Sequence, residues 1–291
     1  MNKSKTMLPH SIRFSALGTQ WRIDTEHALP SHIVTSIHQR IDAFDQTYSR
    51  FRPDSLVTRI AKTAGKYTFP ADIIPIITLY RKLYDVTGGK VTPLIGSMLE
   101  RAGYDAEYSF HEQPQIALPS WDAALDWQGA TLTTTHPVTL DIGAAGKGYV
   151  VDCIAEILNA AQYTDYVIDA SGDLRHQGTT ENRVGLEHPF DQQKVIGVAD
   201  VRGKSICASA SNRRVWDDQL HHIFDPDTQA PVKDIVATWV IAETTMLADG
   251  LATALFFTNP QQLATHFDFQ YVRMYQNGAI DYSHDFNGEL F

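Results

Sequence analysis

One stretch of the chain, from Thr139 to Asp152, constrains both a local fold and a binding site. An apolar, β-branched run ends at Asp141, small residues and Lys147 follow, and a helical pattern begins at Gly148. This order predicts a strand, a tight turn and the N-terminus of a helix. Free N–H groups and the positive end of the helix dipole meet at such a turn, which therefore suits an anion such as a phosphate.

Helical and strand patterns mix along the rest of the chain. Apolar spacing predicts helices over residues 32–48, 72–87, 148–161, 246–257 and 261–267. Strand patterns cover residues 11–15, 19–24, 166–174, 182–186, 195–201, 205–209 and 236–242, with a closing hairpin over 271–282. Residues 131–134 and 138–142 are expected to pair as a hairpin, and Ser31 is expected to cap the first helix.

The order of these elements favours an α+β fold, because strict alternation of strands and helices, which marks a doubly wound sheet, is missing. No repeat, linker or low-complexity segment divides the chain. Residues 1–291 are therefore expected to form a single domain.

The composition of the chain limits the kinds of molecule that it is expected to bind. The 291 residues carry a net charge of −10, and the sequence pI is about 5.6, so nucleic acid is not an expected partner. The two cysteines, Cys153 and Cys207, make neither a disulfide framework nor a zinc-spaced pair, and Cys207 is expected to be inert packing. With no signal-peptide pattern and no apolar run of 18 residues, we expect a cytoplasmic protein without a membrane partner.

A carboxylate and a hydroxyl stand one helical turn apart in the segment Ala248–Leu255. Asp249 and Thr253 are four residues apart, so their side chains share one face of the expected helix. Two hard oxygen ligands on one face suit Mg²⁺ that completes its shell with phosphates and water. The alternative is that Asp249 caps the helix and Thr253 packs in the core.

Three further segments offer polar groups. His222 precedes an Asp-Pro turn and is a candidate base or phosphate partner, although a single histidine is more often structural. The turn 169–173 would let a ligand approach the backbone, or it is an ordinary turn. Residues 205–214 offer hydroxyl and guanidinium groups, or form an exposed loop. The nucleotide motifs G-x-x-x-x-G-K-[ST] and G-x-G-x-x-G are missing, as is the hydrolase elbow G-x-S-x-G.

Four ordered motifs resemble those of the ApbE-type FAD:protein FMN transferases. They are Asp141-x-Gly143-x-x-x-Lys147-Gly148-Tyr149-x-x-Asp152, Asp169-Ala170-Ser171-Gly172-Asp173, His222-Ile223-Phe224-Asp225-Pro226-x-Thr228 and Ala248-Asp249-x-x-x-Thr253. The likeness covers nearly the whole chain. It implies an ApbE-like, T-fold-like domain with mixed, mainly antiparallel sheets and packed helices.

The resemblance also implies an activity. It implies a Mg²⁺-dependent enzyme that takes FAD as its substrate, cleaves the pyrophosphate and releases AMP. FMN would pass to a Thr or Ser hydroxyl of an acceptor flavoprotein. The metal would neutralise charge on the pyrophosphate and position the attack.

The same likeness assigns residues to the site. Asp249, Thr253 and the backbone carbonyl of Val150 would hold the metal, and His222 and Asp249 would be catalytic. The residues implied to bind FAD are Leu17, Phe51, Lys90, Val91, Thr92, Asp141, Lys147, Cys153 and Phe224.

This chain departs from the family pattern at several positions. Leu17 stands where the family usually has Met, Val91-Thr92 replace an aromatic residue and an acid, and Gln229 replaces a glycine. These changes bear on the flavin or adenine contacts more than on the metal pair. Two alternative functions stay open: a Mg²⁺-dependent FAD pyrophosphatase that hands FMN to water, and a flavin-binding protein with weak or no catalysis.

Overall fold

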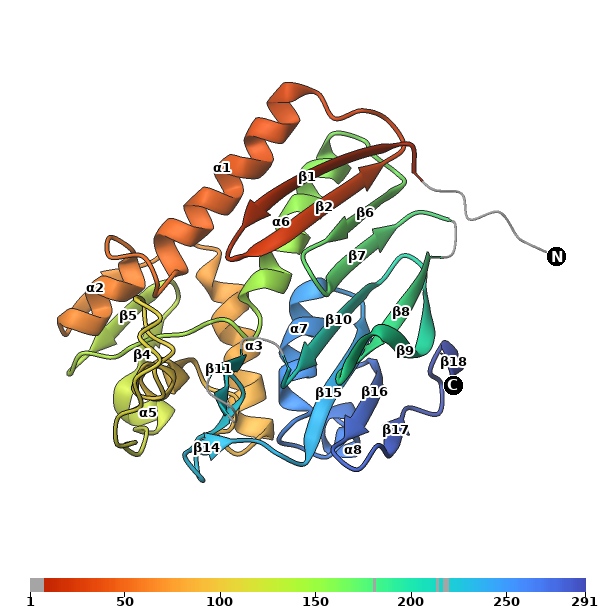
Figure 1. Ribbon diagram of the computed structural model, residues 1–291. Helices are drawn as coiled ribbons and strands as arrows, with labels where there is room; N and C mark the ends of the chain where they lie inside the picture. Colours follow the sequence, from red (N-terminus) through yellow and green to blue (C-terminus); the bar gives the residue numbers. More distant parts are fainter. Residues whose placement is uncertain (1–7, 180–181, 213–214, 217–219) are drawn as a thin grey trace.

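A large antiparallel sheet organises the computed structural model, which describes residues 8–179, 182–212, 215–216 and 220–291 (Figure 1). Its eight strands lie in the order β1-β2-β6-β7-β10-β15-β16-β17, and each neighbouring pair is antiparallel. They are β1 (His10–Ala16), β2 (Thr19–Thr25), β6 (Tyr166–Asp169), β7 (Asp173–Gln177), β10 (Ser205–Ala210), β15 (Ile235–Ala242), β16 (Gln270–Tyr275) and β17 (Ile280–Tyr282).

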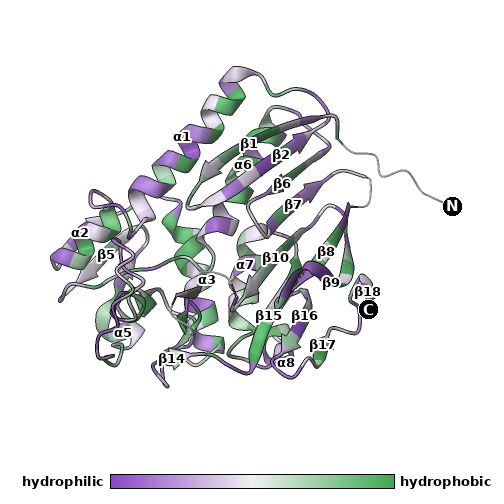
Figure 2. Cartoon of the chain, in the orientation of Figure 1, coloured by the Kyte–Doolittle hydropathy of each residue, from purple (hydrophilic) through white to green (hydrophobic). Residues whose placement is uncertain are grey.

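Side-chain alternation explains how the sheet is buried. In β2, Trp21 and Ile23 are buried in the core, while Gln20 and Arg22, which alternate with them along the strand, are not. The central strand β15 is buried at every position and is hydrophobic along most of its length, because both of its faces are covered (Figure 2).

Four helices cover one face of the sheet (Figure 1). They are α1 (Ser31–Tyr48), α3 (Ile73–Val86), α6 (Gly146–Ala160) and α7 (Thr245–Ala254). Their apolar stripes recur at helical spacing; in α1 the buried residues are Ile37, Ile41, Phe44 and Tyr48. The helix α8 (Pro260–Ala264) follows α7.

A second, three-stranded sheet packs against the other face. It consists of β8 (Asn182–His188), β9 (Asp191–Val201) and β18 (Gly288–Leu290), in the order β18-β9-β8. Leu186 and Ile196 of this sheet join Leu174, Ile206 and Trp239 of the large sheet in one hydrophobic cluster. The large sheet is therefore the middle layer of the fold.

The remaining helices and strands are short. A three-stranded sheet has the order β3-β5-β4, and two hairpins, β11–β12 and β13–β14, lie near the functional site described below. These elements are α2 (Leu56–Lys62), β3 (Gly65–Thr68), η1 (Pro93–Ile95), α4 (Gly96–Arg101), α5 (Trp121–Ala124), β4 (Asp126–Gln128), β5 (Thr131–Thr134), β11 (Val215–Trp216), β12 (Leu220–His221), β13 (Phe224–Asp225) and β14 (Ala230–Pro231).

Three local predictions were wrong. Residues 131–134 pair with β3 and β4 rather than with residues 138–142. The latter segment is not a strand, because its N–H groups find single partners: Val138 donates to the Ile60 carbonyl and Asp141 to the Pro93 carbonyl, at 3.4 and 2.8 Å. Ser31 is the first residue of α1 and not its cap, since Pro30 holds the N-cap position without a side-chain bond.

Helices α6 and α7 approach so closely that a glycine is required between them. A Cβ atom at Gly148 would lie 2.4 Å from the Thr245 carbonyl oxygen and 2.8 Å from Cβ of Asp249. The first clash is with backbone, which cannot rotate away. Gly148 therefore sets the distance between the two helices.

We expect Gly148→Ala to destabilise the fold by about 1–3 kcal/mol, because the added methyl group forces α6 and α7 apart. Chemical denaturation measures this change. Gly65→Ala is the matched control, since the nearest atom to its Cβ would be a Tyr67 ring carbon at an ordinary 3.6 Å. Equal stability of the two variants would show that the helix contact yields easily.

Candidate functional site

Two tight turns meet at one end of the large sheet. The β1–β2 turn holds Leu17 and Gly18 at φ of 50° and 71°, and the β6–β7 turn holds Ser171 and Gly172 at 56° and 107°. The Ser171 hydroxyl donates to the Gln20 carbonyl at 2.8 Å and joins the turns. Left-handed backbone costs energy for Leu17 and Ser171, and such conformations often cluster at functional sites.

The start of α6 fixes the side chain of Asp249 on α7. The Gly148 N–H donates to Asp249 Oδ2 at 3.0 Å, and this bond needs the close helix contact described above. One turn further along α6, the Asp152 carboxylate accepts the N–H groups of Thr245 and Met246, both at 2.8 Å. α6 therefore supplies the hydrogen-bond acceptors for the first turn of α7.

Asp249 and Thr253 lie in the body of α7 and share one face. Thr244 caps this helix by accepting the Leu247 N–H, so the alternative that Asp249 is the cap is excluded. Asp249 is only 5% exposed, yet both residues line the same cavity. The predicted one-turn spacing thus brings a carboxylate and a hydroxyl together at one wall.

That cavity, of about 320 Å³, unites most of the residues expected at the site. Its walls come from α7, the start of α6, the segment after α3 and the β13 region. The expected residues that line it are Lys90, Val91, Thr92, Asp141, Lys147, His222, Phe224, Asp249 and Thr253.

A second cavity, of about 560 Å³, adjoins the first. Leu17 and Phe51 line it, and Phe51 stacks on Tyr108 with ring centroids 5.5 Å apart. Both cavities share a wall made by Gly18, Tyr104, Asp141, Gly143 and Lys147. A ligand with two ends could therefore occupy both cavities with its middle beside Lys147.

Lys147 is held by a buried acid. Its ammonium pairs with the Asp173 carboxylate, which is fully buried, and donates to the Ala170 carbonyl at 3.2 Å. Burial alone would lower the pKa of Lys147, but the charges of Asp173 and Asp249 outweigh it and raise the pKa. Lys147 therefore stays charged, and one carboxylate already balances that charge.

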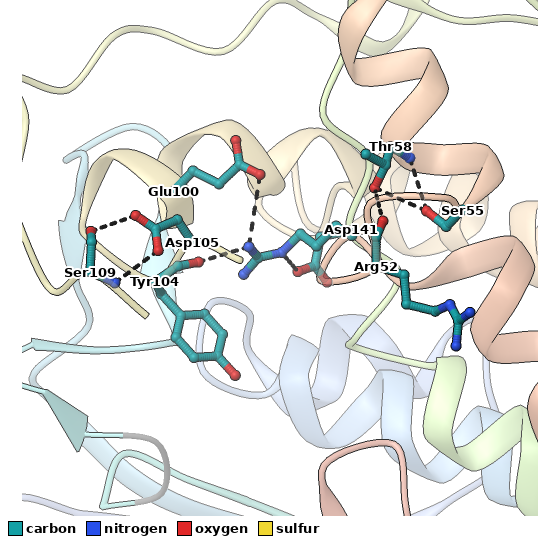
Figure 3. Close-up of polar contacts among 9 residues, drawn as sticks. Arg52, Ser55, Thr58, Glu100, Tyr104, Asp105, Ser109 and Asp141 are labelled. Atoms are coloured by element: carbon teal, nitrogen blue, oxygen red, sulfur yellow. Dashed lines mark hydrogen bonds and ion pairs between the residues drawn. The ribbon is translucent and has the colours of Figure 1, made fainter. Parts of the chain in front are cut away.

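Asp141 is oriented by a buried arginine. Arg50 Nε donates to Asp141 Oδ2 at 2.7 Å, and Arg50 Nη1 donates to the Tyr104 carbonyl at 2.7 Å and lies 4.0 Å from Glu100 (Figure 3). Gly143 N–H donates to the other oxygen of Asp141 at 2.7 Å. These bonds hold the Asp141 carboxylate at the wall between the two cavities.

Lys90 bridges the first cavity to the β13–β14 hairpin. Its ammonium lies 2.5 Å from Asp225 Oδ1 and 2.6 Å from Asp227 Oδ2. Burial raises the pKa of Asp225, but the bonds from Lys90 outweigh it, so the net pKa is lowered. Next to it, Thr92 caps η1 by accepting the Leu94 N–H at 3.2 Å.

The two adjacent histidines have different surroundings. His221 is buried, and its Nε2 lies 2.9 Å from the Val232 carbonyl; burial lowers its pKa. His222 lines the first cavity together with Asp249. His221 thus has the structural role considered for a lone histidine, whereas the candidate residue His222 lies at the cavity.

Val150 and Cys153 line neither cavity. Both lie within α6, where a carbonyl such as that of Val150 accepts the N–H four residues further on. The Cys153 thiol faces α1 instead and accepts from Arg40 at 3.4 Å, and burial raises its pKa. The structure does not bring these two residues to the others.

The segment 205–214 contributes less than its sequence offers. Ser209 and Ala210 line the first cavity, while Arg213 and Arg214 lie outside the described residues. Cys207 is buried, its thiol donates to the Thr245 carbonyl at 3.5 Å, and burial raises its pKa. This environment agrees with inert packing.

Sequence reasoning missed four contributors. Arg50 and Asp173 hold the predicted residues Asp141 and Lys147, and Tyr104 lines the wall shared by both cavities. Tyr80 accepts the Ala144 N–H at 3.1 Å from beneath the start of α6. Arg50 directly precedes Phe51, and Asp173 ends a quoted motif, but no spacing rule signals a buried partner.

The donor set fits a hard divalent cation in part. Asp249 and Thr253 offer one carboxylate and one hydroxyl to the first cavity. Across the described ranges, no group of three or more His, Cys, Asp or Glu side chains could hold a metal ion. Two protein oxygens with space beside them suit Mg²⁺, which usually keeps water and binds substrate phosphates.

Comparisons with known proteins agree with this architecture. The family model described as "ApbE family" matches residues 17–273. The chain belongs to the ApbE family.

The chain is similar to several curated proteins named FAD:protein FMN transferase. One from Klebsiella pneumoniae (strain 342) is 30% identical over 242 residues, which cover 77% of this chain and 75% of that protein. One from Escherichia coli (strain K12) is 24% identical, covering 84% of this chain and 77% of that protein.

Solved structures show the same fold. The ApbE protein from Thermotoga maritima aligns with a TM-score of 0.83 at 21% identity, covering 94% of this chain and 97% of that one. The flavin transferase ApbE from Vibrio cholerae aligns with a TM-score of 0.79 at 20% identity, covering 95% and 98%. The expected family and α+β fold class are confirmed.

Among the described residues, none of the helices combines the length and the apolar character needed to cross a membrane.

Because Asp173 is the buried counter-charge of Lys147, we expect Asp173→Asn to destabilise the fold by about 3–5 kcal/mol. The double variant Lys147→Met with Asp173→Leu should lose less, since it buries no unpaired charge. Urea denaturation measures both. Asp191→Asn, which removes an exposed partner of Lys194, is the control and should have no measurable effect. An Asp173→Asn protein as stable as this control would contradict the buried pair.

Proposed function

We propose that this protein transfers FMN from FAD to a Thr or Ser hydroxyl of an acceptor flavoprotein, with AMP as the leaving group. The names of its relatives support this class of enzyme, a transferase. The observation that carries the proposal is the first cavity, which is lined by Asp249, Thr253, Lys147 and His222.

FAD has two ring systems joined through a pyrophosphate, and the site has two cavities joined at one wall. We place the pyrophosphate at that shared wall, beside Lys147. One ring then enters the second cavity, where Leu17 and Phe51 offer apolar and aromatic surface. Val150 and Cys153 have no part in this proposal, because they line neither cavity.

The charges of the site argue for a divalent cation. Among the described residues, every Lys and Arg that lines either cavity faces a carboxylate; these cations are Arg50, Arg52, Lys90 and Lys147. Asp249 adds a further negative charge beside Lys147, whose pKa it helps to raise. An anionic pyrophosphate would therefore meet a wall with little net positive charge unless a metal supplied it.

Asp249 and Thr253 are the side chains that would hold Mg²⁺. When bound, the ion supplies positive charge that stabilises the pyrophosphate during phosphoryl transfer. Gly148 N–H keeps Asp249 Oδ2 in place, so the carboxylate is oriented before any ligand arrives.

The transfer itself needs a nucleophile and a proton acceptor. The acceptor hydroxyl oxygen attacks the phosphorus of the FMN half, and the bond from that phosphorus to the bridging oxygen breaks. AMP leaves with the bond's electrons. His222, which lines the same cavity as Asp249, takes the hydroxyl proton.

We expect Asp249→Asn and Thr253→Val each to lower kcat/KM for FMN transfer by about 100-fold or more. The first substitution removes the carboxylate charge and the second removes the hydroxyl oxygen, and both groups are proposed to hold the cation that stabilises the transition state. Incorporation of flavin into a co-expressed flavoprotein, followed by mass spectrometry, measures the reaction. Asp42→Asn, an exposed acid on α1, is the control and should transfer normally. Full transfer by Asp249→Asn would overturn the metal assignment.

Water competes with the acceptor hydroxyl, so a reaction without acceptor separates transferase from pyrophosphatase. With FAD and Mg²⁺ alone, we expect little release of FMN and AMP, as measured by chromatography. Addition of EDTA should abolish transfer to an acceptor. Rapid acceptor-free release of FMN would instead favour an FAD pyrophosphatase.

A further inference from the structure

The large sheet has an open edge inside the functional site. β10 pairs with β15 along its whole length, Ser205–Ala210, but with β7 only over Ser205–Cys207. β7 begins at Asp173, after the left-handed turn, and the Ala208 N–H donates to the Gly172 carbonyl at 3.0 Å where this pairing ends. Beyond that point, no strand among the described residues pairs with this side of β10 (Figure 1).

The polar groups of Ala210 point to the open side. The Ser211 N–H donates to the Val236 carbonyl at 2.9 Å, towards β15, while the Ala208 N–H points the other way, towards Gly172. In an antiparallel ladder the hydrogen-bonding direction alternates with every residue. Ala210 therefore turns its N–H and its C=O away from β15, to the side on which β7 has ended.

This open edge is continuous with the first cavity. Ala208, Ser209 and Ala210 line that cavity together with Asp249 and Thr253. Their side chains are small, and Ala208 is exposed. Cys207 points to the α7 face, because its thiol reaches the Thr245 carbonyl, so Ser209 points to that face as well.

We propose that an extended segment of the acceptor flavoprotein adds to β10 as a short strand and presents its Thr or Ser hydroxyl to the cavity. This inference rests on the proposed transferase function. A residue of the segment exchanges two backbone hydrogen bonds with Ala210, as in known strand addition. The neighbouring residue, opposite Ser209, then points to the α7 face, where Asp249 lies.

The hydrogen-bonding pattern favours a peptide over the pyrophosphate of FAD at this edge. Ala210 presents one donor and one acceptor side by side. The phosphate oxygens of FAD only accept hydrogen bonds, so they match the N–H and oppose the C=O. A peptide backbone carries both groups at the required spacing.

Ala210→Pro tests the pairing, because proline removes the N–H that faces the open side and leaves the bonds to β15 in place. The probe is a pool of synthetic decapeptides, each with one central Thr and small or apolar neighbours, supplied with FAD and Mg²⁺. We expect the yield of FMN-peptide, counted by mass spectrometry, to fall at least tenfold. The dissociation constant for FAD, measured by flavin fluorescence, should stay within twofold.

Ser11→Pro is the matched control. Ser11 lies on the outer strand β1, and the alternation of the β1–β2–β6 ladders points its N–H away from β2. It should keep the wild-type peptide yield. Thermal unfolding confirms that both proline variants fold.

Three results would overturn the inference. An unchanged FMN-peptide yield in Ala210→Pro would show that the edge does not pair with the acceptor. A loss of FAD binding in step with the yield would assign the edge to FAD. A wild-type enzyme that binds FAD but makes no FMN-peptide would refute the transferase function, and the inference would fall with it.

Peptide chemistry gives a second test that needs no variant. N-methylation of a residue directly beside the Thr, on the side that pairs with Ala210, should lower the yield at least tenfold. N-methylation two residues from the Thr should have little effect, because that N–H points away from β10. Equal yields at both positions would contradict strand addition even if Ala210→Pro failed to fold.

Discussion

The close contact of α6 and α7 at Gly148 is the constraint on which the site depends. Only a residue without Cβ lets the two helices meet with a backbone carbonyl at this distance. That approach brings the Gly148 N–H to Asp249 and the Asp152 carboxylate to the first turn of α7. The close helix contact therefore fixes the orientation of the Asp249 carboxylate. It also supplies hydrogen-bond acceptors for the N–H groups in the first turn of α7, the helix that carries Asp249. The part of the first cavity that carries Asp249 and Thr253 is consequently supported by two packed helices rather than by a loop.

Charge is distributed in this site as pairs. Lys147 with Asp173 and Arg50 with Asp141 are buried pairs that fix geometry while contributing little net charge. In the proposed function, such pairs would position the ligand by shape and hydrogen bonds, and they would leave the neutralisation of its pyrophosphate to an added cation. The acidic protein, with a net charge of −10, is thereby compatible with an anionic nucleotide as substrate.

The sequence predicts what is local and periodic. Neighbouring residues determine the spacing of Asp249 and Thr253, the start of α6 and the closing hairpin over 271–282, and the structure has each of them. The strand expected at 138–142 fails because its apolar pattern reflects burial between distant segments, near Ile60 and Pro93, and not ladder pairing. Arg50 and Asp173 were missed for a related reason: a buried ion pair joins residues far apart in sequence, and no period marks it. Val150 was placed by likeness alone; the sequence predicts its helix, but only the structure shows that Val150 lines neither cavity.

The open edge of β10 follows from the same geometry that shapes the cavity. The left-handed turn at Ser171 and Gly172 lies where the pairing between β7 and β10 stops. Because β7 does not extend past this turn, no strand of the large sheet lies beside Ala210 on that side. An unpaired edge ordinarily invites aggregation, but this one is short and lies next to a cavity. The turn at Ser171 and Gly172, of which Ser171 lines the first cavity, thus also creates the gap that the proposed acceptor segment would fill. In the proposed function, binding of both substrates to the first cavity would place the acceptor hydroxyl near the pyrophosphate.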